Sequence, residues 1–166
     1  MTRPILFGSV IGCALLLAWG WFPAGYAIPG AVVLAIGLLW LIAEIARWQP
    51  AAYLGLFLAA LGAGAGEQMH LPAISLLLGL ACALAAWDLS AFSRRMAMAS
   101  PQDDRQALEL RHLGRLAAAL GAGVALGLLA LGIHTVRFKF EFAGLLALLG
   151  IWGLSLLLTR MRQRAE

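Results

Sequence analysis

Two acidic residues, Glu44 and Asp88, lie inside long apolar segments of the chain. An ionisable side chain within a membrane-spanning helix is costly to bury and is therefore a candidate for function. Glu44 precedes Arg47 by three residues, so the two could pair along one helix face. Asp88 has no basic residue as close in sequence, although Arg95 or Arg115 could reach it in the fold. Two interpretations stay open. The favoured one is a set of interfacial ion pairs that fix helix depth; the other makes both acids proton or cation carriers facing a shared cytoplasmic cavity.

A second set of polar residues is expected on the outer side of the membrane: Glu67, Met69, His70, His134 and Glu141. Imidazole and carboxylate groups can share a metal ion, and Glu67 and His70 would meet on one helical turn. This spacing is much weaker than a paired His or Cys motif, so solvated polar turns are the simpler interpretation. The metal, if any, is unknown, and the absence of paired mid-membrane histidines argues against haem or chlorophyll.

Motifs for catalysis are absent from the sequence. It contains no Gly-x-Ser-x-Gly, no His-Glu-x-x-His, no phosphate-binding loop and no aspartate-rich motif of headgroup transferases. The only lysine, Lys139, is expected in a turn, and His112 is expected to be cytoplasmic without a special role. Cys13 and Cys82 fall in different segments and are interpreted as small buried apolar residues rather than cluster ligands. We therefore expect a non-enzyme with no cofactor beyond bound lipids.

The amino-acid composition indicates that these residues lie in a membrane protein. Of 166 residues, 63% are apolar and 12% are charged, and the mean hydropathy is +0.90. Soluble domains of this size bury only about two-thirds of their surface, and disordered chains are poor in apolar residues. Both classes are excluded. The chain is predicted to be an all-α, polytopic membrane protein that forms a single integral membrane domain over residues 1–166.

Six segments are apolar enough to cross the bilayer as helices. They are residues 5–22, 28–46, 51–66, 71–92, 113–134 and 142–159. With the N-terminus in the cytoplasm, ten of the 12 basic residues fall on the cytoplasmic side, as the positive-inside rule expects. Both termini are then cytoplasmic, and the protein is expected to be multi-pass in the cytoplasmic membrane, either a bacterial inner membrane or a plasma membrane.

The segments are most simply arranged as three hairpins. Each returning arm has a Trp about two turns before an Arg, which suggests a triplicated hairpin or simply the usual interfacial residues. The cytoplasmic loop over residues 93–112 is expected to be partly helical, because Ser100, Pro101 and Asp103 resemble a helix start. Nothing interrupts the helical pattern from Pro101 to His134, so the fifth helix is predicted to extend about three turns beyond the bilayer.

Helices in lipid associate through small residues that allow close approach. Five glycines are predicted packing positions: Gly8, Gly12, Gly121, Gly123 and Gly127. The fifth helix is expected to be a packing centre, whether for internal contacts, for oligomerisation or for a larger assembly. The third span is short, and its outer end is rich in glycine.

The leading functional expectation is a non-catalytic structural or accessory subunit of a larger membrane complex. The alternative is a small homo-oligomeric transporter or channel for an ion or solute. Expected partners are membrane lipids and other membrane subunits or further copies of the chain. The basic residues are spread along one membrane face without a compact patch, which excludes nucleic acid as a partner.

Overall fold

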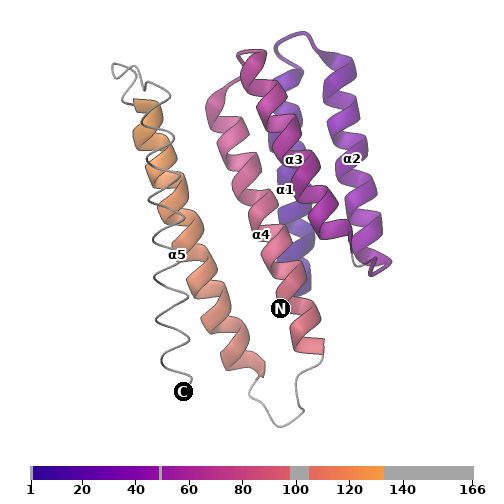
Figure 1. Cartoon of the computed structure of the whole chain (residues 1–166), viewed down its shortest axis with the longest axis vertical. Helices are drawn as coiled ribbons and strands as arrows, with labels where there is room; N and C mark the ends of the chain where they lie inside the picture. The colour runs from indigo at the N-terminus through magenta and orange to yellow at the C-terminus, as the bar shows by residue number, and fades with distance from the viewer. Residues whose placement is uncertain (1, 49, 98–104, 133–166) are drawn as a thin grey trace. The chain divides into compact units, whose positions relative to one another are not determined.

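The computed structural model describes residues 2–48, 50–97 and 105–132 of the chain. These residues form five α-helices and contain no strand (Figure 1): α1 (Thr2–Trp21), α2 (Ala27–Ile45), α3 (Ala51–Gln68), α4 (Ala73–Ala97) and α5 (Arg105–Gly132). Each helix coincides with one of the first five predicted spans. By internal contacts the chain divides into residues 1–131 and 132–166. The predicted sixth span, residues 142–159, lies outside the described residues.

Four of these helices, α1, α2, α4 and α5, are long and apolar enough to cross a membrane. The described part of the chain is thus all-helical, and its composition suits a membrane. α3 falls short because its last turn carries Glu67 and Gln68, which lower its mean hydropathy. Its 18 residues span about 27 Å at the rise of an α-helix, slightly less than a hydrocarbon core.

Short connections make neighbouring helices antiparallel (Figure 1). The turn after α1 closes with Gly25 at φ 83° and with Tyr26 N–H donating to the Trp21 carbonyl at 3.1 Å. Proline then stands in or just before the first turn of the next helix: Pro29 inside α2, Pro50 before α3 and Pro72 before α4. A proline there costs little, because the first N–H groups of a helix have no partner within it.

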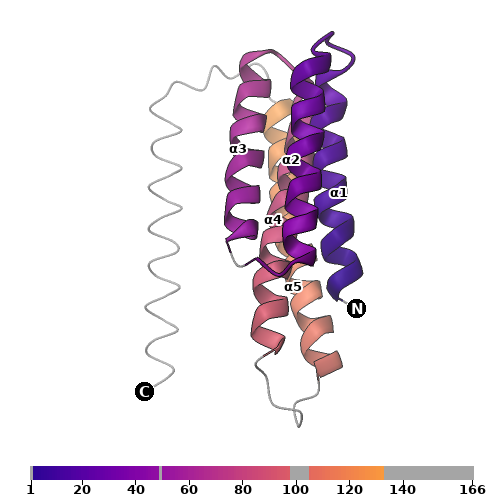
Figure 2. The same ribbon diagram turned by 90° about the vertical axis from the view of Figure 1, so that its right-hand side faces the viewer.

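The core is made where large side chains lie over small residues of a neighbouring helix. α1 packs most extensively against α4 and α2, and α3 packs mainly against α4. Gly37 of α2 lies against Ala14 of α1, and Gly55 of α3 lies under the Trp40 indole of α2. Trp40, Leu17 and Leu89 are buried here. In lipid, such close approach replaces the hydrophobic effect as the source of helix association. Figure 2 shows helices α1 to α4 running alongside one another.

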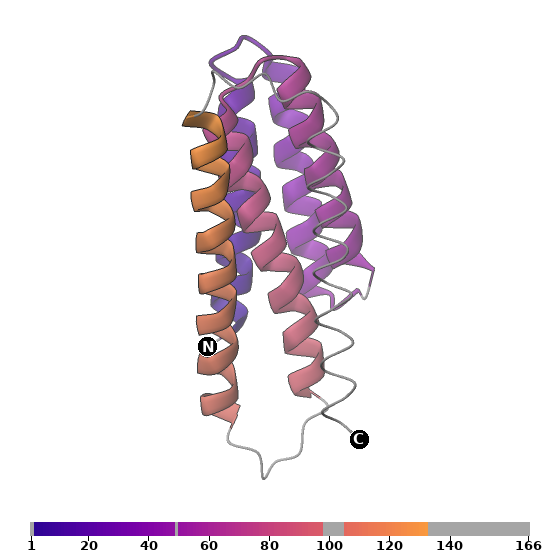
Figure 3. The ribbon, with the colours of Figure 1, turned by 60° about the vertical axis from the view of Figure 1, so that its left-hand side comes forward.

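α5 runs antiparallel to α4 (Figure 3). Its leucine face contributes Leu113 and Leu116, which pack against the buried cluster, and Leu77 of α4 lies against Gly127. None of the residues along Gln106–Gly132 is buried. α5 is therefore held along one side only, among the described residues.

Candidate functional site

Glu44, near the end of α2, accepts hydrogen bonds from two neighbouring side chains. The Ser90 hydroxyl of α4 lies 3.0 and 2.9 Å from its two carboxylate oxygens. The Trp40 indole N–H donates to Oε1 at 3.4 Å. Ser90 is only 1% exposed, so this contact ties α2 to α4 from inside the bundle. A hydrogen bond to a charged group contributes more than one between neutral partners.

The expected pairing of Glu44 with Arg47 is not formed, because α2 ends between them. Arg47 has φ 57°, its N–H donates to the Glu44 carbonyl at 3.1 Å, and the Trp48 N–H donates to the Ala43 carbonyl at 2.9 Å. This is the Schellman end of a helix, a position usually held by glycine. A side chain other than glycine in this left-handed conformation costs about 1 kcal/mol.

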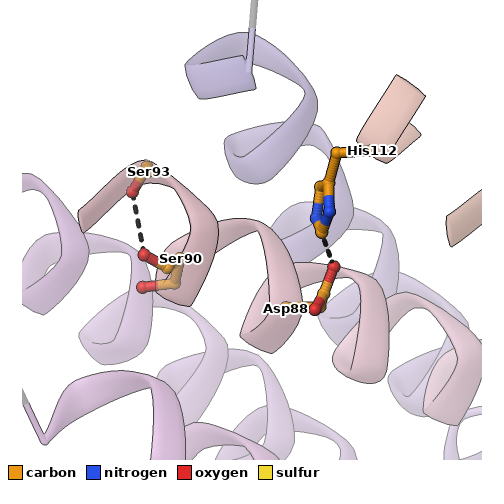
Figure 4. Close-up of polar contacts among 4 residues, drawn as sticks. All are labelled: Asp88, Ser90, Ser93 and His112. Atoms are coloured by element: carbon orange, nitrogen blue, oxygen red, sulfur yellow. Dashed lines mark hydrogen bonds and ion pairs between the residues drawn. The ribbon is translucent and has the colours of Figure 1, made fainter. Parts of the chain in front are cut away.

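Asp88, on α4, forms an ion pair with His112 of α5 (Figure 4). Its Oδ2 lies 2.7 Å from the imidazole Nε2, a contact that is an ion pair when His112 is protonated. The His112 ring also stacks on Phe92, with centroids 3.9 Å apart and 4° between the planes. Neither Arg95 nor Arg115 pairs with Asp88. His112, which was expected to have no special role, thus connects α5 with α4.

Glu44 and Asp88 therefore face different helices. Glu44 faces Ser90, and Asp88 faces α5. Glu44 borders a cavity at the end of the bundle, whereas Asp88 does not line it.

The cavity beside Glu44, which we call the basic cavity, has a volume of about 450 Å³ and is bordered by α1, α2 and α4. Three arginines line it, Arg3, Arg47 and Arg94, together with Ser90 and Ser93. The Ser93 hydroxyl donates to the Ser90 carbonyl at 2.9 Å. The cavity thus combines three guanidinium groups with one carboxylate that already has donors.

A separate, apolar cavity of about 380 Å³ lies between α1, α2 and α3. Its lining includes Val10, Cys13, Val33, Trp40 and Leu58. A hydrocarbon chain fits this lining, whereas a polar ligand would find hardly any hydrogen-bond partner there. Cys13 and Cys82 are free thiols.

The predicted outer cluster is described only in part. Glu67 and His70 are both exposed at the end of α3, and His70 has φ 57° at the end of that helix. No group of three or more potential metal ligands occurs among residues 2–48, 50–97 and 105–132. His134 and Glu141 lie outside those residues, so the metal site stays a prediction.

The predicted packing glycines differ in their surroundings. A Cβ on Gly12 would lie 3.5 Å from the Cys82 sulfur, and one on Gly127 would meet Leu77. A Cβ added to Gly8, Gly121 or Gly123 would have nothing within 4 Å among the described residues. The closest approaches occur instead at Gly37, Gly55 and Gly79, which sequence spacing did not single out.

Comparison of the chain with protein-family models, with curated proteins and with solved structures gives no match.

Proposed function

We propose that this chain is a non-catalytic integral membrane protein that acts as a structural or accessory subunit of a larger membrane complex. The observation that carries the proposal is the face of α5 directed away from α4. At spacings of four, three and four residues it presents Gly114, Ala118, Gly121 and Ala125, all exposed. We call these residues the small stripe.

The small stripe has the chemistry of a helix-packing surface. Elsewhere in the described bundle, some glycines are covered by a neighbour, as Gly37 is by Ala14 and Gly79 by Leu17, whereas Gly8, Gly62 and Gly64 have nothing within 4 Å of an added Cβ. Gly114 and Gly121 have nothing within 4 Å of an added Cβ among the described residues. Lipid tails fill such a surface less well than another helix does, because backbones can approach closely there. We infer that a transmembrane helix of another subunit packs on it.

The distribution of polar groups supports a structural role over catalysis. The Ser90–Glu44 hydrogen bonds connect α4 with α2, and the Asp88–His112 pair connects α4 with α5. Both acids thus have partners that hold helices together. A catalytic site would require a nucleophile or acid–base pair aimed at open space.

The finer topology belongs to the same proposal: six spans in three hairpins, with both termini in the cytoplasm and the protein in the cytoplasmic (inner or plasma) membrane. Its support is that Arg3, Arg47, Arg94, Arg95 and Arg111 all lie toward the end of the bundle where α1 begins and α4 ends. Labelling of Arg95→Cys and Gln68→Cys in a variant without Cys13 and Cys82 tests it. An impermeant maleimide should reach Cys at 68 from outside intact cells, and Cys at 95 only after permeabilisation.

Native mass spectrometry of protein extracted in mild detergent tests the main proposal. We expect the wild type to carry another subunit, and Gly121→Leu to release it. Gly64→Leu is the matched control, because Gly64 on α3 also has nothing within 4 Å among the described residues. A monodisperse homo-oligomer without another chain would contradict the proposal. So would a cross-link from position 121 to residues 142–159 of the same chain, because the small stripe would then be filled internally.

The alternative is a small homo-oligomeric transporter or channel, and the position of Glu44 beside the basic cavity is the observation that favours it. Flux of an ion or solute is measured in vesicles reconstituted with the protein. Flux that Glu44→Gln abolishes and Asp88→Asn leaves intact would favour the transporter or channel over the subunit role.

A further inference from the structure

The basic cavity gathers positive charge from three separate parts of the chain. Arg3 comes from the first turn of α1, Arg47 follows α2, and Arg94 lies in the last turn of α4. These residues are far apart in sequence and meet only in the folded bundle.

The guanidinium groups of Arg3, Arg47 and Arg94 have N–H donors that are not used by other described side chains. None of them forms an ion pair or a side-chain hydrogen bond with another residue in the described part of the chain. Glu44, the one carboxylate in the lining, is engaged by Ser90 and Trp40. Guanidinium groups offer planar pairs of donors that match phosphate oxygens. The cavity is therefore built to accept an anion.

The backbone at Arg47 is in the left-handed conformation that ends α2. Its φ of 57° is a conformation that glycine adopts freely and that an arginine adopts at a cost. Glycine at this helix end would remove one of the three guanidinium groups that line the cavity.

The remaining lining identifies the depth of the site in a bilayer. Leu6, Phe7 and Ile45 line the cavity beside the arginines, and Trp48, next to Arg47, is 54% exposed. Tryptophan and arginine together are typical of the headgroup level of a membrane. Polar donors thus adjoin an apolar wall at the depth where a phospholipid carries its phosphate.

We propose that the basic cavity binds a phosphate group through Arg3, Arg47 and Arg94, carried either by an anionic phospholipid or by a free phosphate ion. The basic cavity shares no residue with the small stripe on α5. A test of phosphate binding therefore does not depend on whether the proposed subunit role is correct.

Delipidated protein in a neutral detergent, titrated with dioleoylphosphatidylglycerol and followed by native mass spectrometry, tests the site. Parallel titrations use dioleoylphosphatidylcholine and inorganic phosphate in place of dioleoylphosphatidylglycerol. Arg94→Gln should weaken phosphatidylglycerol binding by about tenfold or more. Arg47→Gly should act similarly while relieving backbone strain. Arg95→Gln is the matched control, since Arg95 is exposed on the same helix and does not line the cavity.

The parallel titrations separate the two sources of phosphate. Binding of phosphatidylglycerol that millimolar inorganic phosphate does not displace identifies a lipid site. Saturable binding of inorganic phosphate alone, lost in Arg94→Gln, identifies a free-phosphate site. Equal affinity for phosphatidylglycerol and phosphatidylcholine without phosphate binding would overturn the proposal, as would equal losses in Arg94→Gln and Arg95→Gln. Circular dichroism and gel filtration of each variant show that the fold is retained.

Discussion

The imidazole of His112 lies flat on the ring of Phe92, 3.9 Å between centroids. Its Nε2 is at the same time 2.7 Å from Asp88 of the same helix as Phe92. One side chain of α5 is thus held by α4 through both a ring face and a charge. Gly127 rests against Leu77 about four turns further along α5. These side chains connect α5 with α4 at two places along its length.

Replacing His112 should separate these two contributions. We expect His112→Phe to keep the ring contact and to lose the ion pair, for a cost of about 0.5–1 kcal/mol, because the pair is partly exposed. His112→Ala should cost about 1–2 kcal/mol more, since the stacked ring is lost as well. Thermal unfolding in detergent measures both. Equal stabilities for the two variants would show that the ring contact contributes nothing.

Ser90→Ala should destabilise the bundle by about 1–3 kcal/mol, because it leaves the Glu44 carboxylate without its main donor. Ser9→Ala is the control: the Ser9 hydroxyl donates to the Ile5 carbonyl of its own helix and is exposed. A double-mutant cycle with Glu44→Gln measures the coupling. Additive effects of the two substitutions would contradict a direct interaction.

Gly37→Ala and Gly55→Ala should each cost about 1–3 kcal/mol through overpacking. The added methyl group would meet Ala14 in the first case and the Trp40 ring in the second, and neither neighbour has a flexible end that can swing away. Gly64→Ala on α3 is the matched control, because it meets nothing within 4 Å in the described structure. Unfolding midpoints in one detergent provide the comparison. If Gly64→Ala were as damaging as Gly55→Ala, close packing would not be the cause.

Arg47→Gly and His70→Gly should each stabilise the fold by up to about 1 kcal/mol, since glycine adopts positive φ without a steric penalty. The corresponding alanine variants keep the strain and should gain nothing. The glycine–alanine difference at each position, measured by thermal unfolding, isolates the backbone effect. Should alanine prove as good as glycine, the left-handed conformation is not adopted in the folded protein.

Helix positions could be predicted from sequence because apolar length and proline placement act locally. The predicted and observed helices differ mainly where charges were taken as boundaries. α1 begins at Thr2 rather than at Ile5, and α4 continues past Arg94 to Ala97. Positively charged arginines near a helix C-terminus interact favourably with the negative end of the helix dipole. Arg94 and Arg95 are therefore compatible with the last turn of α4 and do not end the helix. Residues 105–112 are helical, as the unbroken pattern predicts, whereas the predicted start at Pro101 lies outside the described residues.

Side-chain partners were harder to predict because they depend on how helices rotate against one another. Glu44 and Asp88 were identified, but their partners were not. Ser90 was overlooked as an ordinary polar residue, although it is two residues from Asp88 and so faces another side of α4. His112 did carry a signal: it is four residues before Leu116, on the face of α5 that packs inward.

The Ser90–Glu44 contact has a consequence for the order of assembly during synthesis. Glu44 emerges from the ribosome 46 residues before the hydroxyl that binds it. A hairpin of α1 and α2 alone therefore contains an acid that lacks its serine donor, and the bond forms only when α4 is present. A nascent chain stopped before Ser90 leaves Glu44 with the Trp40 indole N–H as its side-chain donor within α2, so completion of α4 adds to the stability of the bundle.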